Sequence, residues 1–361
     1  MKNAIKSIIV FLALVFSGCS AFQPAAPNEA TIPASFTALV WNVQALFDGE
    51  ENGSEYGEYL PAAGWTKEKY NARITAISQA IKQAASTNSI PDIIGIVEVE
   101  NSAVIEDLAS GTLSGYGFLW TAFAANPGSA LGIGFLSRFP LKDVRTHSIT
   151  ILNDTAPRPV LEVKIEGGRM PLIFLLCHWK SKLGGDDATE AQRRASARVV
   201  QRRLREINAS EPGTPVIVMG DLNENHDEFS RRLAFSALLP DDPFAAAMAI
   251  NAGALDDFLV LSGEKPPVAS HFQHKVPAFY SPWENELEGG SYYYRGQWET
   301  IDHFLLSDSL FNRPGWVYSG CEIINQTPFV KADGIPNAYN PRNGLGLSDH
   351  LPIMLHLRHV E

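Results

Sequence analysis

The sequence has little cysteine and fewer basic than acidic residues. Only three of its 361 residues are cysteine, which argues against a small scaffold held together by disulfides. Lysine and arginine number 29 against 40 aspartate and glutamate, for a net charge of -11. A protein that holds nucleic acid through a broad basic surface has the opposite balance. Any phosphate chemistry must therefore come from a local site, where we expect a cation to be supplied.

The sequence also lacks an apolar run long enough to span a bilayer. The N-terminal run IIVFLALVF follows two lysines and ends in FSGCS, which is typical of an export signal. FSGCS resembles the lipobox of bacterial lipoproteins, which implies removal of residues 1–18 as a signal peptide and lipidation of Cys19. Ser20 implies, by the same resemblance, the outer membrane. We expect a cell-envelope protein, lipid-anchored in the periplasm or at the outer membrane; plain secretion is the alternative.

The remaining chain is expected to form a short tether and one domain. Residues 19–35 are rich in alanine and proline without a period, as in a flexible tether. No linker-like composition or internal repeat interrupts residues 36–361, so we expect one domain. We also expect a monomer. Cys177 lies in an apolar run, where a thiol behaves as a small hydrophobe. We expect it to stay reduced; a disulfide with Cys321 is the alternative.

Apolar periodicity predicts an α/β fold. Helices are expected at 67–84 and 187–207, and their core-facing residues at helical spacing are Ile74, Ile77, Ile81, Ala195, Val199 and Leu204. Strand-like segments are FTALVWNV, PDIIGIVEVE, ALGIGFLSRFP, PVLEVKIEG, PLIFLLCHWKS, PVIVMGDLN, ETIDHFLLS and LPIMLHL. Several of these strands follow one another with no helix between them, which indicates antiparallel pairing. We predict two mixed sheets packed face to face with helices outside.

Polar residues that can bind a metal or move a proton end, or closely follow, many of these apolar runs. They are Asn42, Glu98, His178, Asp221, Asn223, Asp302, Asp349 and His350. Each of them alone has an ordinary explanation, such as a turn, a helix cap or a surface carboxylate. Strand ends in α/β proteins collect at one edge, where ligands bind. Together these residues therefore predict one cleft.

The motifs that hold these residues resemble those of a known superfamily. WNVQ, IVEVEN, LLCHWKS, VMGDLNE, TIDHFLLS and LSDHLPI, between residues 41 and 353, are similar to motifs of the endonuclease/exonuclease/phosphatase superfamily. Its members include pancreatic-type deoxyribonucleases, abasic-site endonucleases, neutral sphingomyelinases and inositol-polyphosphate 5-phosphatases. The resemblance implies a four-layer α/β/β/α sandwich of two mixed β-sheets with outer helices.

The resemblance also implies roles for the residues. Glu98 is the main metal ligand, Asn42 belongs to the metal site, and Asp349 completes it. Asp221 and Asn223 hold the attacking water and the scissile phosphate, and His350 is the catalytic histidine with Asp302 as its carboxylate partner. His178 stands where abasic-site endonucleases have tyrosine, which disfavours abasic-site repair.

Phosphate-ester hydrolysis explains why such residues are needed. Negative charge grows on the phosphoryl and leaving oxygens, and Mg²⁺, or alternatively Mn²⁺ or Ca²⁺, neutralises it through oxygen ligands. Asp221 can orient the water and accept its proton, and Asn223 can donate to a phosphoryl oxygen. In an extended segment the two face the same side, with Leu222 turned into the packing. His178 is assigned as leaving-group acid or phosphate clamp, and the division of roles between Asp221 and His350 stays open.

Substrate contacts are harder to predict. Lys180 and Arg73 are candidates to reach the cleft. Six arginines crowd one helix, where we expect a solvated face and contact with a phosphate backbone is the alternative. They are Arg193, Arg194, Arg198, Arg202, Arg203 and Arg205. The segment WENELEGGSYYYRGQW can be a hairpin with core aromatics or a rim that stacks bases or sugars. Specificity is expected in loops 48–65, 183–190 and 264–299.

We predict an exported, Mg²⁺-dependent phosphodiester hydrolase, a nuclease acting on extracellular or periplasmic DNA or RNA. The alternative within enzymes is a phospholipid hydrolase, sphingomyelinase-like, or an inositol-phosphate hydrolase. The alternative of another class is a surface lipoprotein that binds phosphate ligands without catalysis.

Overall fold

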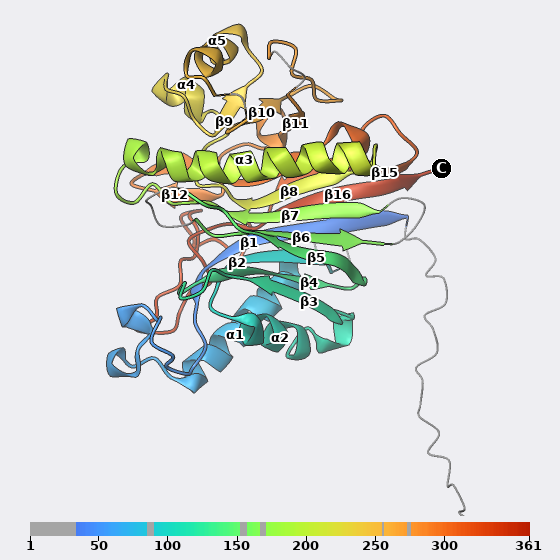
Figure 1. The fold of residues 1–361 in the computed structure, drawn as a ribbon. Coiled ribbons are helices and arrows are strands. Elements are labelled where there is room, and N and C mark those ends of the chain that lie inside the picture. The colour runs from blue at the N-terminus through green and yellow to red at the C-terminus, as the bar shows by residue number, and fades with distance from the viewer. Residues whose placement is uncertain (1–33, 85–89, 152–156, 167–170, 255, 273–275) are drawn as a thin grey trace, which may run out of the picture. The chain divides into compact units, whose positions relative to one another are not determined.

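The computed structural model describes residues 34–84, 90–151, 157–166, 171–254, 256–272 and 276–361 (Figure 1). Contacts divide the chain into the units Met1–Thr31 and Ile32–Glu361, and every described residue belongs to the second. The predicted signal peptide, Cys19 and the tether up to residue 33 lie outside the described residues.

The first sheet has six strands in the order β15-β16-β1-β2-β4-β3. Their bounds are β1 Ser35–Leu46, β2 Ile93–Val99, β3 Trp120–Ala124, β4 Gly132–Ser137, β15 Gly315–Ile323 and β16 Ile353–Val360. β1 runs parallel to β2, whereas every other pair in this sheet is antiparallel. The sheet is therefore mixed, as the helix-free succession of strands predicted.

The second sheet has eight strands in the order β5-β6-β7-β8-β14-β11-β10-β9. Their bounds are β5 Leu141–His147, β6 Val160–Ile165, β7 Leu172–His178, β8 Val216–Asp221, β9 Leu238–Pro240, β10 Leu259–Ser262, β11 Ala278–Tyr280 and β14 Asp302–Leu306. β7 and β8 are parallel, and β8 and β14 are antiparallel. A separate hairpin pairs β12 Tyr292–Tyr294 with β13 Gln297–Glu299.

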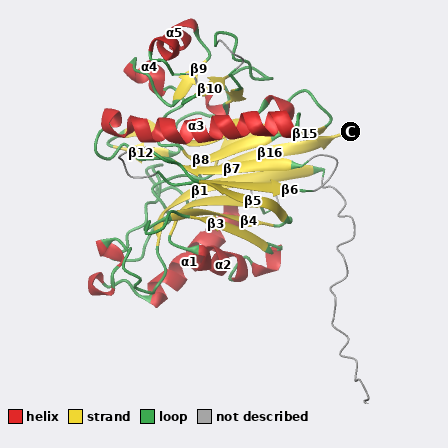
Figure 2. Ribbon diagram, viewed as in Figure 1, coloured by secondary structure: helices red, strands yellow, loops and turns green. Residues whose placement is uncertain are grey.

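Helices cover the outer faces of the stacked sheets (Figures 1 and 2). The α-helices are α1 Lys67–Ala84, α2 Ser102–Ser110, α3 Asp186–Ser210, α4 Glu228–Arg232 and α5 Pro243–Asn251. Single 3₁₀ turns are Gly57–Tyr59, Pro61–Ala63, Ser114–Tyr116, Pro282–Glu284 and Asp308–Leu310. None of the described helices is both long and apolar enough to cross a membrane.

Three hydrophobic clusters hold the four layers together. The first joins α1 and α2 to the six-stranded sheet through residues such as Ile77 and Ile96. The second fills the space between the sheets, where Phe135 meets Phe174 edge to face. The third joins α3 to the eight-stranded sheet. The predicted α/β/β/α sandwich of two mixed sheets is confirmed.

The predicted core positions of both long helices are buried, but the arginine face of α3 is not solvated throughout. Arg193 is fully buried, with its Nε 2.8 Å from Glu224 Oε1. Arg203 lies against Glu162, a buried carboxylate of β6, at 2.6 Å. The solvated-face prediction is wrong for these two arginines, because carboxylates on neighbouring strands and turns pair with them under the helix. Cys177 and Cys321 are free thiols.

Candidate active site

The candidate residues meet at one edge because opposite ends of antiparallel strands share that edge. Parallel strands β7 and β8 end there in His178 and Asp221, which pair in register. Antiparallel β14 begins there with Asp302 opposite Asp221. β16 runs antiparallel to β1, so the segment that leads into it brings His350 to the same edge. The predicted convergence on one cleft therefore follows from strand direction.

Irregular backbone carries Asn42 and Glu98. The register between strands shifts next to Asn42 in β1 and around Glu98 in β2, and such bulges redirect side chains. Gln44, Ala45 and Glu98 have φ of 55°, 56° and 68°, which is the left-handed region that side chains disfavour. The Ala45 N–H donates to Glu98 Oε2 at 2.8 Å, and the Gln44 N–H donates to Asn42 Oδ1 at 2.9 Å.

The Asn42 amide links the two acidic residues of the site. Its Nδ2 donates to Glu98 Oε1 at 3.1 Å and to Asp221 Oδ2 at 3.0 Å. Two adjacent carboxylates accept hydrogen bonds from the NH₂ group, whereas the resemblance implied that Asn42 belongs to the metal site. In this arrangement Asn42 orients the acidic pair.

His350 and Asp302 form a buried ion-paired dyad. His350 Nδ1 lies 2.8 Å from Asp302 Oδ2, and the Ser291 hydroxyl donates to the same oxygen at 2.6 Å. Although burial disfavours the charged ring, the carboxylate of Asp302 and the charges of Asp349 and Asp221 raise the pKa of His350 to about 10. His350 is therefore an imidazolium at neutral pH.

Asp221 occupies the centre of the site. Its Oδ2 lies 3.8 Å from His178 Nε2 and 4.0 Å from His350 Nε2. Burial and the charge of Asp302 raise the pKa of Asp221 above its ordinary value, although the His350 charge opposes this. Such a carboxylate holds a proton more readily near neutral pH than an exposed one does.

Asn223 differs from the expected extended geometry. It has φ of 52°, and its N–H donates to Asp221 Oδ1 at 2.9 Å, so the chain turns directly after β8. Its side-chain amide donates to the Trp179 carbonyl at 3.2 Å. Leu222 is fully buried, as predicted.

His178 is a buried neutral imidazole. Its Nε2 lies 3.7 Å from Glu98 Oε1, and its Nδ1 has no hydrogen-bond partner among the described residues. Burial, together with the charges of Arg158 and His350, lowers the pKa of His178 well below 6.5. A neutral ring can donate one hydrogen bond, but it is a poor reservoir of a proton for a leaving group.

The remaining predicted residues have different positions. Asp349 is half-buried, and its pKa is raised by burial and by Glu98 against the charge of His350. Lys180 lines a pocket beside the site. The prediction that Arg73 reaches substrate is wrong. Arg73 is 2% exposed and donates to the carbonyls of residues 43, 44 and 45 at 2.6–2.9 Å, so it supports the loop beneath the acidic pair.

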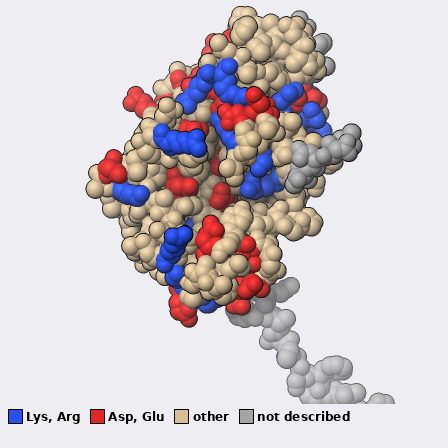
Figure 3. All heavy atoms as spheres, turned by 90° about the vertical axis from the view of Figure 1, so that its left-hand side faces the viewer, with Lys and Arg blue, Asp and Glu red and all other residues tan. Residues whose placement is uncertain are grey.

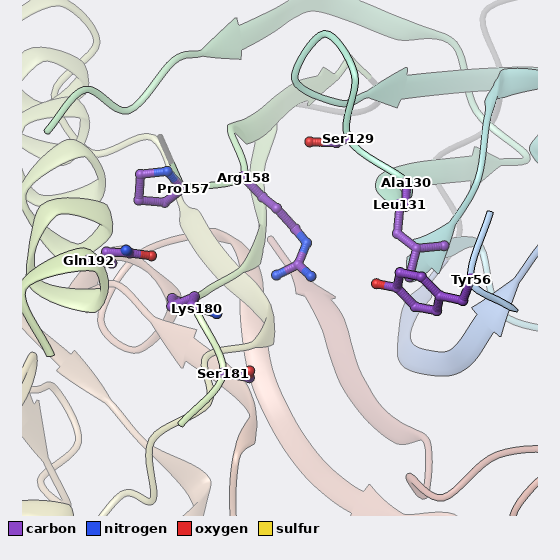
Figure 4. A pocket seen from close by; sticks show the side chains of 9 residues that line it. All are labelled: Tyr56, Ser129, Ala130, Leu131, Pro157, Arg158, Lys180, Ser181 and Gln192. Atoms are coloured by element: carbon purple, nitrogen blue, oxygen red, sulfur yellow. The ribbon is translucent and has the colours of Figure 1, made fainter. Parts of the chain in front are cut away.

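A pocket of about 290 Å³ lies beside His178 and carries positive charge. Figure 4 shows the Arg158 guanidinium pointing into it between Lys180 and Tyr56. Sequence reasoning did not single out Arg158. It precedes β6, which is antiparallel to β7, so it reaches the edge at which β7 ends. That antiparallel neighbour was the available clue.

A larger pocket of about 620 Å³ is lined by Asn223 and by residues of the β12–β13 hairpin. Ser181 borders both pockets. All three loops expected to set specificity contribute to these pockets, whose lining includes Tyr56, residues 183–186, Tyr292, Tyr294, Arg295 and Glu299. The face that contains the site is hollowed, with acidic atoms in the hollow and lysine and arginine around it (Figure 3).

The donor set fits a divalent oxygen-seeking cation. Glu98 and Asp221 both approach Asn42 Nδ2 and His178 Nε2, so two acidic oxygens converge in one small space. The Glu98 side chain is 23% exposed and keeps acceptor capacity beyond its two hydrogen bonds. Mg²⁺ is commonly held by few carboxylates and several waters. Asp221, Asp302 and His350 also approach one another closely enough to share an ion. However, Asp302 and His350 already form an ion pair with each other.

Comparisons with known proteins agree with this architecture. A family model described as "Endonuclease/Exonuclease/phosphatase family" matches residues 37–246. The structure of D. rerio TDP2 complexed with single strand DNA product is similar, with TM-score 0.53 and 13% identity over 90% of this chain and 99% of that one. The human Nocturnin catalytic domain has TM-score 0.51 and 14% identity over 90% and 95%. C. elegans TDP2 has TM-score 0.49 and 18% identity over 90% and 75%. No curated protein matches the sequence.

Proposed function

Because the chain belongs to the endonuclease/exonuclease/phosphatase family, we propose that it is a metal-dependent phosphodiesterase that cleaves nucleic acid. The observation that carries this proposal is the position of Asp221 between two imidazoles. Its Oδ2 lies within 4.0 Å of both His178 and His350, and His350 is ion-paired with Asp302. A protein that only binds phosphate gains nothing from burying a carboxylate, a neutral imidazole and an imidazolium together.

Each side chain has a distinct role in the proposed reaction. Asp221, with its raised pKa, orients the attacking water and accepts its proton, since a base whose pKa approaches the working pH is the more effective one. His350 remains charged and stabilises the phosphoryl oxygens. Neutral His178 and the Asn223 amide donate hydrogen bonds to the phosphate. We therefore assign Asp221 as the base and His178 as the phosphate clamp.

Glu98 would hold the cation, with Asp349 beside it and Asn42 orienting the acidic pair. A bound Mg²⁺ or Mn²⁺ neutralises the charge that grows on the phosphoryl and leaving oxygens. Arg73 contributes indirectly, because it fixes the carbonyls of the loop whose Ala45 N–H binds Glu98.

The pocket next to His178 favours a polyanionic substrate. Arg158 and Lys180 bring two positive charges to a pocket that adjoins the scissile position. A polynucleotide has a further phosphate one nucleotide away, and arginine and lysine bind it by charge. The fold is also that of D. rerio TDP2, whose structure holds single strand DNA product. Net charge of -11 suits a small local contact better than a long basic track.

We further propose that the protein works in the cell envelope, anchored through Cys19. The support is the N-terminal sequence, with its charged start, apolar run and FSGCS. Membrane fractionation of the full chain and of Cys19→Ser tests this. Recovery of both proteins in the same soluble fraction would contradict the anchor.

A substrate panel tests the proposed activity. Plasmid DNA, RNA, sphingomyelin and inositol phosphates are incubated with the protein and Mg²⁺, and Asp221→Asn is compared with Glu106→Gln, a change at an exposed position of α2. We expect cleavage of nucleic acid, loss of at least about 100-fold in Asp221→Asn, and full activity in Glu106→Gln. Cleavage of sphingomyelin or inositol phosphates alone would contradict nucleic acid as the substrate while keeping the hydrolase. Inactivity on all four substrates would favour a protein that binds phosphate ligands without catalysis.

A further inference from the structure

The β12–β13 hairpin presents two different faces, and only one of them is core. Side chains alternate along a strand, so Tyr293 faces opposite to Tyr292 and Tyr294. Tyr293 packs edge to face on its cross-strand partner Trp298, with ring centres 5.2 Å apart, and Trp298 packs against the core of α1 and α2. One face therefore fixes the hairpin, which leaves the Tyr292–Tyr294 face free to contact a ligand.

The Tyr292–Tyr294 face of the hairpin stacks on the imidazole ring of His350. Tyr292 stacks on His350 with ring centres 4.4 Å apart and planes 26° apart. Tyr294 stacks on Tyr292 at 6.0 Å and 13°. A column of three rings thus runs from the ion-paired histidine to the outermost ring, Tyr294, which is 45% exposed.

Hydrogen bonds and a β-bridge connect the hairpin to the His350–Asp302 dyad and to the residue that follows His350. Ser291, directly before Tyr292, donates its hydroxyl to Asp302 and accepts the Leu351 N–H at its carbonyl at 2.7 Å. Tyr292 also forms a β-bridge with His350. The ring column is therefore held at a fixed position relative to the phosphate-binding groups.

The pocket beside this column is suited to a flat group. It has a volume of about 620 Å³ and is lined by both tyrosines, by Arg295 and by Asn223, whose amide is a phosphate donor in the proposed reaction. Arg295 lies over the Tyr294 ring at 5.1 Å. Leu183, 84% exposed, stands at the pocket's edge. Aromatic rings, an apolar edge and one cation are the groups on which single-stranded bases stack.

We propose that this pocket is a base-stacking subsite, in which an unpaired nucleobase next to the scissile phosphate lies against Tyr294. This inference rests on the proposed function and narrows it: the preferred substrate is single-stranded nucleic acid. A base within a duplex shows only its edges to a protein, whereas stacking on Tyr294 requires a free face.

The test compares two oligonucleotides of equal length and charge, one ordinary single-stranded DNA and one with an abasic sugar at every position. Wild type is expected to cleave the ordinary strand with a kcat/KM about 10- to 100-fold higher. Tyr294→Ala is expected to lose this preference while keeping its rate on the abasic strand, and Tyr294→Phe is expected to retain it. Tyr116→Ala, at an exposed tyrosine that lines neither pocket, is the matched control.

Each outcome bears on one proposal. Equal cleavage of both strands by wild type, or an equal loss on both in Tyr294→Ala, overturns the stacking subsite and leaves the phosphodiesterase intact. If neither strand is cleaved, binding of adenosine 5′-monophosphate and of ribose 5-phosphate is measured by calorimetry. Tighter binding of the nucleotide, lost in Tyr294→Ala, keeps the base site while rejecting the proposed activity; equal binding rejects the base site too.

Discussion

Replacing Asp302 by asparagine should make the positive charge of His350, which stays constant around neutral pH in the wild type, depend on pH. Asp302→Asn keeps the size of the side chain but removes the charge 2.8 Å from His350 Nδ1. That charge is the largest contribution that raises the pKa of His350 to about 10. Without it, burial still disfavours the imidazolium, so the pKa should return to about 6.5 or below.

The size of the effect follows from the charged fraction. With a pKa of about 6.5, about 1% of His350 is protonated at pH 8.5 and about 90% at pH 5.5. If the proposed reaction requires the imidazolium, the ratio of wild-type to variant kcat should be about 100 at pH 8.5 and close to 1 at pH 5.5. Because the charge of Asp302 also raises the pKa of Asp221, the variant should keep Asp221 ionised to lower pH, which lowers the ratio further at pH 5.5 and leaves the direction of its change the same.

The assay is steady-state cleavage of one oligonucleotide between pH 5.5 and 8.5 at saturating metal. Ser291→Ala is the matched control, because it removes the hydroxyl that donates to Asp302 Oδ2 but leaves the carboxylate charge. It should lower activity by less than about 10-fold, with an unchanged pH dependence. A ratio for Asp302→Asn that stays constant across this range would refute the reasoning, since Asp302 would then act through position rather than charge.

Three further results are expected. EDTA should abolish activity without unfolding the protein, and Glu98→Gln should raise the Mg²⁺ concentration for half-maximal rate at least about 10-fold; an unchanged metal titration would exclude Glu98 as ligand. Arg73→Met should lower the free energy of unfolding in urea by about 3 kcal/mol, because the carbonyls of residues 43–45 lose their donor. No loss of stability would contradict a supporting role of Arg73 in this loop. Glu162, whose pKa is held at about 2 against burial by His147 and Arg203, stabilises the fold above pH 4.5 and loses this effect as pH falls through about 2. Glu162→Gln should therefore cost about 3 kcal/mol at pH 7, with the difference from wild type vanishing toward pH 2.

The parts of the fold that the sequence predicted are those with a strong apolar period. Strands β1, β2, β4, β6, β7, β8, β14 and β16 coincide with the predicted segments, and α1 and α3 bury the expected residues. β5 was not predicted, since LKDVRTH is largely exposed at the edge of its sheet. An edge strand that is exposed on both faces and carries charged residues has little apolar pattern to detect.

Some residues of the site were likewise predicted from the sequence, and others were missed or misjudged. His178 was predicted from its position at the end of an apolar run, and Asp302, which begins β14, from its position in the strand-like segment ETIDHFLLS. Arg158 was missed because it lies just before the strand-like segment PVLEVKIEG and in no motif of the resemblance. Arg73 was misjudged because its buried environment consists of backbone carbonyls. Hydrogen bonds between a side chain and distant backbone leave no periodic pattern in sequence.

The backbone around the acidic pair explains why such supporting contacts exist. Gln44, Ala45, Glu98 and Asn223 all have φ between 52° and 68°, which costs about 1 kcal/mol or more for each non-glycine residue. These conformations direct the Ala45 N–H at Glu98 and the Asn223 N–H at Asp221. The strain persists because neighbouring groups hold it, Arg73 foremost, through its bonds to the carbonyls of residues 43–45. The same loop in a regular β-strand would be more stable, but its amides would pair across the sheet and leave the carboxylates without fixed donors. The strained backbone therefore lowers the local stability of this loop, but it fixes the positions of Glu98 and Asp221.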